Sequence, residues 1–141
     1  MSKVKILEEI HINAEPQRVW DLMGDFGGLE AWFPAVRECT VTGSGIGAVR
    51  RLEMPDGTAL EEEQLERDDA GYRYFYNMCG GDPMPFTDYT STFELKAEDG
   101  GTRVSWSAEF VPMEGAPIDP QAFVRDVYRG GLEQGRKLLE A

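Results

Sequence analysis

The sequence predicts a single α+β domain in which a curved seven-stranded antiparallel sheet packs against one long C-terminal helix. The chain has 141 residues, a length typical of one domain, so we expect residues 1–141 to fold as one unit. Between residues 36 and 112 the apolar residues recur with a period of two, which is the period of β-strands. Beyond Pro112 the period becomes helical and continues towards the C-terminus.

The first strand is expected over residues 3–12, where the even positions from Val4 are mostly apolar. His11 has the opposite parity, so we expect it on the solvent side. Pro16 then begins a short helix, since proline is favoured in a first helical turn. A second short helix around residues 29–33 follows a pair of glycines. Helices this short are unstable alone and must lie against the sheet.

Six further strands are expected, over residues 36–42, 47–54, 58–67, 72–78, 86–97 and 102–111. The turns between them are rich in Gly, Asp and Pro, as in an antiparallel meander. The long helix begins after Asp119, a good N-cap residue followed by proline. Its predicted buried stripe is Val124, Val127, Tyr128, Gly131, Gly135 and Leu138. One helix cannot fill the concave face of a strongly bent sheet, so we expect a cavity between them.

Composition excludes several classes of function. The chain is acidic, with a net charge of −12, which disfavours binding to nucleic acid and to anionic membranes. No apolar run approaches the roughly 18 residues of a membrane span, and the start of the chain does not resemble a signal peptide, so we expect a cytoplasmic protein. Cys39 and Cys79 are expected to be free thiols. With a single histidine and no Cys-x-x-Cys motif, no metal site is expected.

The hairpin around the sequence PDGT brings an arginine opposite a glutamate. A two-residue turn would place Arg50 opposite Glu63, whereas a three-residue loop with a bulge at Gly57 would place it opposite Glu62. Arg50 has the parity of Leu52, so we expect it to point into the cavity. A buried guanidinium needs a partner, because desolvation costs about several kcal/mol per ion. The pair is either structural, or a site where Arg50 binds a ligand carbonyl or carboxylate or stabilises an enolate.

Tyrosines recur on neighbouring strands of the meander. Tyr72, Tyr74 and Tyr76 alternate along one strand and Tyr89 lies on the next. Tyrosine suits a lining that holds an apolar ligand and orients one polar group, although the three alternating residues could instead cover the outer face of the sheet. For Tyr89 we expect the lining position.

Several ordered motifs resemble those of one known family. They are Pro16, Val19-Trp20, Asp25-Phe26-Gly27-Gly28, Trp32 and Pro34 in the run from Ala14 to Val36, GAVRRL at residues 47–52, Asp56-Gly57, Glu63 with Leu65, Pro85 with Tyr89, and GTRVSWSAEFVP at residues 101–112. Together they resemble bacterial polyketide cyclase/dehydrase-like proteins of the SRPBCC (START-like, birch-pollen-allergen-like) superfamily. The resemblance implies the helix-grip fold, in which two short helices follow the first strand and a long C-terminal helix lies over a cavity. It also favours Glu63 as the partner of Arg50.

The expected function is binding of a small hydrophobic molecule, aromatic or polyketide-like, in this internal cavity between the sheet and the C-terminal helix. The candidate ligand-binding residues are Trp20, Phe26, Trp32, Arg50, Leu52, Glu63, Tyr74, Tyr89, Trp106, Phe110, Val127, Tyr128 and Gly131. No cofactor is implied, and the protein is expected to be a monomer or homodimer.

Two alternatives stay open. One is a cofactor-independent cyclase or dehydratase in which Arg50, Glu63 and a tyrosine act on the ligand. The other is a partner-binding module, like the cochaperones of the superfamily, in which the acidic surface and the loop over residues 80–88 matter and the cavity is incidental. In the ligand-binding interpretations this loop could instead gate the cavity mouth. The helix glycines Gly131 and Gly135 either let the helix pack closely or leave room for a ligand.

Overall fold

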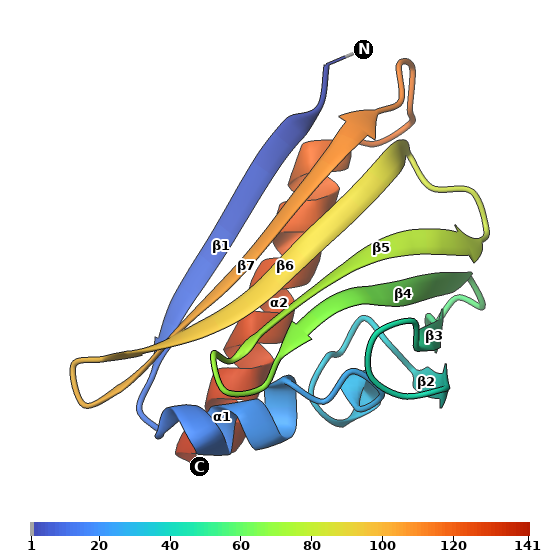
Figure 1. The fold of residues 1–141 in the computed structure, drawn as a ribbon. Coiled ribbons are helices and arrows are strands. Elements are labelled where there is room, and N and C mark those ends of the chain that lie inside the picture. Colours follow the sequence, from blue (N-terminus) through green and yellow to red (C-terminus); the bar gives the residue numbers. More distant parts are fainter. Residues whose placement is uncertain (1) are drawn as a thin grey trace.

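The computed structural model describes residues 2–141 and contains one curved sheet, one long helix and two short helical segments (Figure 1). The elements are β1 (Val4–Ile12), α1 (Pro16–Met23), the 3-10 helix η1 (Leu29–Ala31), β2 (Glu38–Thr42), β3 (Val49–Glu53), β4 (Ala59–Asp68), β5 (Arg73–Gly81), β6 (Phe86–Glu98), β7 (Gly101–Pro112) and α2 (Pro120–Glu140). The seven strands pair in the order β1-β7-β6-β5-β4-β3-β2, and every neighbouring pair is antiparallel. The expected fold class is confirmed.

The sheet bends around α2, which lies along its concave face (Figure 1). The pairing of β4 with β5 shifts register between Glu61 and Glu62 and again between Gln64 and Glu66. Irregularities of this kind bend a strand and increase its twist. At the far end of β5, Gly81 has a φ of +109° and packs against the backbone of β4, where a side chain would clash. These features curve the sheet away from a flat layer.

Helix α2 begins as expected, because the Asp119 side chain accepts hydrogen bonds from the backbone N–H groups of the first turn. Its buried residues are Val124, Tyr128, Gly131, Leu132, Gly135 and Leu139. The prediction for Leu138 is wrong, since this residue is 43% exposed and Leu139 is buried instead. After Gly135 the buried stripe continues four residues on rather than three, as the 3.6-residue period requires over several turns.

Two glycines of α2, Gly131 and Gly135, lie where the helix packs closely against neighbouring side chains. A Cβ added at Gly131 would lie 2.6 Å from the ring of Phe33, and one at Gly135 would lie 2.6 Å from the end of Met23. A Cβ at Gly130 would meet nothing within 4 Å. Gly131 and Gly135 therefore let α2 lie close to the segments between β1 and β2.

The three alternating tyrosines, Tyr72, Tyr74 and Tyr76, do not share one environment. Tyr74 and Tyr76 are buried on the concave face, while Phe75 between them is half-buried on the other face. Tyr72 precedes the strand with a φ of +55°, and its hydroxyl donates to Gln17. Only Tyr74 and Tyr76 thus belong to the interior.

The histidine and the two cysteines lie on three different strands. His11 is half-buried, and its Nε2 lies 2.8 Å from the carbonyl oxygen of Glu98. Cys39 is buried and Cys79 exposed, and both are free thiols. Within residues 2–141 no three His, Cys, Asp or Glu side chains group as metal ligands would, and no helix has the length and apolarity to cross a membrane.

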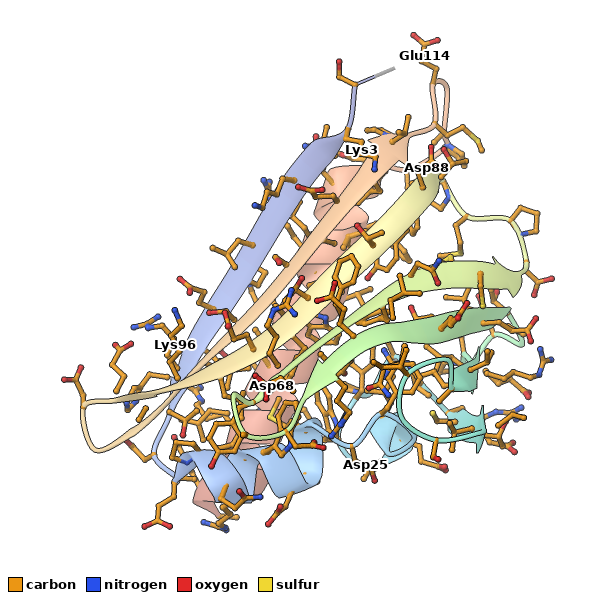
Figure 2. All side chains as sticks on the ribbon, in the orientation of Figure 1. Lys3, Asp25, Asp68, Asp88, Lys96 and Glu114 are labelled. Atoms are coloured by element: carbon orange, nitrogen blue, oxygen red, sulfur yellow. The ribbon has the colours of Figure 1, made fainter. Side chains whose placement is uncertain are left out.

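Within residues 2–141 the charged side chains are exposed or half-buried, with Arg50 and Glu62 as the exceptions. Lys96, Asp88 and Glu114 are exposed at hairpin and strand ends, away from the space between sheet and helix (Figure 2). The acidic surface therefore lies outside, and the concave face is mostly apolar.

Candidate functional site

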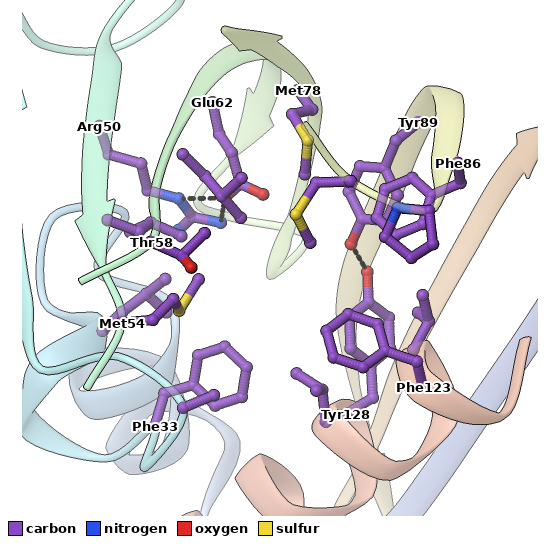
Figure 3. Close-up of a pocket in the computed structure, with 18 of the residues that line it drawn as sticks. Phe33, Arg50, Met54, Thr58, Glu62, Met78, Phe86, Tyr89, Phe123 and Tyr128 are labelled. Atoms are coloured by element: carbon purple, nitrogen blue, oxygen red, sulfur yellow. Dashed lines mark hydrogen bonds and ion pairs between the residues drawn. The ribbon is translucent and has the colours of Figure 1, made fainter. Parts of the chain in front are cut away.

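A pocket of about 500 Å³ lies between the concave face of the sheet, the η1 region and the first half of α2 (Figure 3). It is lined by Leu29, Phe33, Ala35, Arg50, Leu52, Met54, Pro55, Asp56, Thr58, Leu60, Glu62, Tyr76, Met78, Pro83, Met84, Pro85, Phe86, Tyr89, Trp106, Phe123, Val124, Val127 and Tyr128. The exposed lining residues Pro55, Asp56 and Pro83 belong to the β3–β4 and β5–β6 turns, so the mouth lies between these turns. The floor is formed by buried residues of the sheet.

The first polar cluster of the pocket is centred on Arg50, which is fully buried. Its Nε donates to Glu62 Oε1 at 2.8 Å and its Nη1 donates to the carbonyl oxygen of Phe26 at 3.0 Å. The guanidinium carbon lies 4.1 Å from the ring centroid of Phe26 and 4.5 Å from that of Tyr76, distances at which a cation is attracted to an aromatic face. The guanidinium is thus held by a carboxylate, a backbone carbonyl and two rings.

One guanidinium nitrogen of this cluster has an ion-pair partner but no hydrogen bond. Arg50 Nη2 lies 2.8 Å from the same Glu62 oxygen, an ion-pair distance, but within residues 2–141 it has no hydrogen-bond partner. The hydrogen bond that Glu62 accepts ends on Oε1, and Figure 3 shows a carboxylate oxygen of Glu62 turned towards the pocket. The pair therefore offers the pocket a donor and an acceptor side by side.

Burial and charge act against each other in this pair. Burial lowers the pKa of Arg50, but the Tyr74 hydroxyl and the Glu62 carboxylate outweigh burial and raise that pKa above its ordinary value. For Glu62 burial is the largest effect and raises the carboxyl pKa, while Arg50 opposes the rise. The guanidinium is therefore charged at neutral pH, and Glu62 is the member of the pair that can gain a proton.

The second polar cluster consists of hydroxyl groups and one indole. The hydroxyls of Tyr89 and Tyr128 are hydrogen-bonded to each other, and Ser91 Oγ lies 2.8 Å from Tyr128 Oη. Trp106 Nε1 donates to Tyr76 Oη and to Ser91 Oγ, each at 3.1 Å. Burial raises the pKa of Tyr76 to about 12, and that of Tyr89 and Tyr128 well above 10. These phenols stay protonated near neutral pH and act as hydrogen-bond donors and acceptors.

The two clusters face each other across an apolar space. Figure 3 shows Arg50 and Glu62 on one side of the pocket and Tyr89 and Tyr128 on the other. Tyr76 links them, because its ring lies beside the guanidinium and its hydroxyl accepts from the indole of the second cluster. The arrangement can hold an apolar body and orient polar groups at both ends.

The partner of Arg50 differs from the one favoured by the sequence. In the pairing of β3 with β4, Arg50 lies opposite Glu62 and Glu63 lies opposite Val49. The loop closes through a hydrogen bond from Met54 N to Thr58 O, and Gly57 has a φ of +92°. The three-residue loop with a Gly57 bulge is therefore correct, and the expectation of Glu63 is wrong by one residue.

Six of the residues expected at the site line the pocket: Arg50, Leu52, Tyr89, Trp106, Val127 and Tyr128. The other seven do not: Trp20, Phe26, Trp32, Glu63, Tyr74, Phe110 and Gly131. Most of the second group are buried one layer behind the wall. Phe26 packs on Arg50, Phe110 packs on Phe86 with ring centroids 5.0 Å apart, and Gly131 lies under Phe33.

The sequence interpretation missed several lining residues, above all Phe33, Met78 and Phe123. It also did not place Met84 and Phe86 in the wall, where Phe86 is buried and Met84 half-buried. The sequence signal for these two lining residues is the presence of Met and Phe in the β5–β6 turn. This signal predicts a pocket wall only if the turn is already known to fold over the concave face.

Comparison with known proteins agrees with this architecture. The family model described as "Polyketide cyclase / dehydrase and lipid transport" matches residues 3–140. An uncharacterized protein from Bacillus thuringiensis superposes with a TM-score of 0.88 at 27% identity, covering 98% of this chain and 100% of that one. XoxI from Bacillus cereus gives a TM-score of 0.84 at 28% identity, covering 99% and 96%.

Ara h 8.0201 shares the fold with a TM-score of 0.80 at 20% identity, covering 98% of each chain. The family match spans nearly the whole chain and agrees with the resemblance seen in the sequence motifs. The chain belongs to the polyketide cyclase/dehydrase and lipid transport family of the SRPBCC superfamily and has its helix-grip fold.

Proposed function

We propose that this protein binds a small, predominantly hydrophobic molecule in the pocket between the sheet and α2. The observation that carries the proposal is a pocket of about 500 Å³ whose apolar wall is interrupted by two buried polar clusters. Ligand sites typically enclose about 300–1,000 Å³ and combine an apolar lining with a few well-placed polar groups. The family description, which names lipid transport, supports the same class of ligand.

Aromatic side chains make up much of the wall, which favours an aromatic or polyketide-like ligand over a flexible acyl chain. The rings of Phe86 and Tyr89 stack with centroids 5.3 Å apart, and the indole of Trp106 stacks on Tyr128 at 4.0 Å. Rigid rings packed against one another form flat surfaces that suit flat ligands. The pocket favours ligand binding over the alternative of a partner-binding module, in which a cavity would be incidental.

Cyclisation or dehydration of a bound ligand is the second candidate. The observation that favours it is the Glu62 carboxyl, whose pKa is raised by burial and which faces the pocket beside a charged guanidinium. A carboxyl tuned towards neutral pH can exchange protons with a ligand, and Arg50 can stabilise an enolate. Under this proposal Glu62→Gln abolishes turnover of an aromatic polyketide while leaving its binding measurable.

A fluorescence titration with N-phenyl-1-naphthylamine, a neutral hydrophobic probe, tests the binding proposal. Val127 lines the pocket from α2, so Val127→Trp fills part of the pocket. Leu138→Trp adds the same side chain at an exposed site of the same helix and serves as the control. We expect the Val127 variant to weaken probe binding about tenfold or more, which corresponds to about 1.4 kcal/mol, and the control to bind as the wild type does.

Equal binding by both variants would place the probe outside the pocket and contradict the proposal. Circular dichroism spectra of the two variants establish that both retain the fold, so a loss of binding is attributable to the filled pocket.

A further inference from the structure

We propose that the Arg50–Glu62 pair makes the pocket selective for neutral ligands that carry adjacent hydrogen-bond acceptor and donor atoms, and that it rejects carboxylates. This inference rests on the proposed function and deepens it by naming the class of ligand. Amides and hydroxy ketones have the required combination of groups.

The donor side is the unsatisfied part of the guanidinium. Arginine has five N–H donors and no acceptor. Arg50 is 0% exposed, and within residues 2–141 its Nη2 is in ion-pair contact with Glu62 but makes no hydrogen bond, while Nε and Nη1 do. A buried donor whose hydrogen bonds are not all made is costly, so an uncharged ligand oxygen that accepts from Nη2 is favoured.

The acceptor side is the carboxylate next to it. Glu62 is 4% exposed, receives its hydrogen bond from Arg50 on Oε1, and turns an oxygen towards the pocket. Nη2 lies only 2.8 Å from Oε1, so a ligand that uses both groups needs its acceptor and donor close together. An amide edge, with C=O and N–H on one carbon, meets this requirement.

The charge balance excludes an anion. The buried guanidinium is neutralised by Glu62, so a ligand carboxylate would bring a second negative charge to a desolvated ion pair. Arg50 is the only basic residue among the lining residues found in the described chain, which include the acids Glu62 and Asp56. The net charge of −12 adds a repulsive field for anions. A buried arginine ordinarily indicates a site for an acidic ligand. Because Glu62 neutralises Arg50, this pocket instead favours a neutral ligand.

Three ligands that differ only at the polar group test the inference by isothermal titration at neutral pH. 2-Naphthamide carries acceptor and donor, 2-acetonaphthone carries only the acceptor, and 2-naphthoate is the anion of nearly the same shape as the amide. For the wild type we expect the amide to bind about tenfold or more tightly than the anion, and more tightly than the ketone.

The variant Glu62→Gln removes the negative charge and keeps the shape, so the preference should reverse, with 2-naphthoate gaining about tenfold in affinity. Glu63→Gln, the next residue on β4, lies off the pocket wall and should leave all three affinities unchanged. If Glu62→Gln does not fold, the ratio of amide to anion affinity in the wild type decides the question alone.

Equal or tighter binding of 2-naphthoate by the wild type would overturn the inference, and so would failure of 2-naphthamide to bind a protein that binds N-phenyl-1-naphthylamine. Both results leave the proposed function standing. The absence of binding by all the probes would instead overturn the proposed function.

Discussion

The buried ion pair leads to the sharpest stability prediction. Replacing Arg50 by Met leaves the Glu62 carboxylate buried without its cation, and breaking such a pair from one side costs about 3–5 kcal/mol. The Phe26 carbonyl also loses its donor, which adds about 1 kcal/mol. Because burial already raises the pKa of Glu62, the carboxyl can take up a proton, so we expect the total near the lower end of the range.

Replacing Glu62 by Leu leaves a cation that cannot lose its charge in a protein, so this variant should be the less stable of the two. In the double variant Arg50→Met/Glu62→Leu both charges are absent and apolar side chains of similar size fill the site. Substitutions of this kind are often neutral or stabilising, so we expect the double variant to lie within about 1 kcal/mol of the wild type. The coupling free energy between the two positions should then be about 5 kcal/mol or more.

Urea denaturation monitored by circular dichroism at pH 7 gives the free energy of unfolding of all four proteins. A double variant as unstable as the sum of the two single variants would refute the reasoning, because the pair would then be required for folding itself. A stable double variant that no longer distinguishes 2-naphthamide from 2-acetonaphthone would show that the pair serves ligand recognition.

Three further predictions concern the helix and the buried phenols. Gly130→Ala should stabilise the protein by about 0.5–1 kcal/mol, because its Cβ meets only open space. Gly131→Ala should destabilise it by about 1–3 kcal/mol, because its Cβ presses on an aromatic ring. Urea denaturation compares the two variants, and equal effects on stability would contradict the close packing of α2. Asp119→Ala should cost about 1 kcal/mol in the same assay through loss of the N-cap, and an unchanged midpoint would show that the cap is not used. Because the pKa of Tyr76 is raised to about 12, its contribution to stability is complete below pH 10 and is lost as the pH rises to 12, about 3 kcal/mol in all. Absorbance at 295 nm should therefore show the buried tyrosines ionising together with loss of the circular dichroism signal; ionisation near pH 10 in an intact fold would contradict the burial.

Much of the fold could be predicted from local patterns. Alternating residues along each strand and Gly, Asp and Pro at the turns are properties of short segments, and they located all seven strands and the long helix. Asp119 with the following proline marked the start of α2 correctly. These features need no knowledge of distant contacts.

The site was less predictable because it depends on register and on folding at a distance. A single extra residue in the loop at Gly57 moves the partner of Arg50 from Glu63 to Glu62, and the turn sequence is compatible with both. Parity places Tyr74 on the same face as Tyr76, but it does not predict that Tyr74 lies behind the wall while Met78 lies on it. That distinction depends on the bend of the sheet.

Methyl NMR of protein labelled at the methionine methyl groups tests the central claim, that a hydrophobic ligand occupies the space between the sheet and α2. Met54, Met78 and Met84 line the pocket, Met23 is buried elsewhere against Gly135, and Met113 is exposed. On addition of N-phenyl-1-naphthylamine we expect the three pocket methyl signals to shift and the Met23 signal to stay in place. Shifts confined to Met113, with the pocket signals unchanged, would contradict the claim.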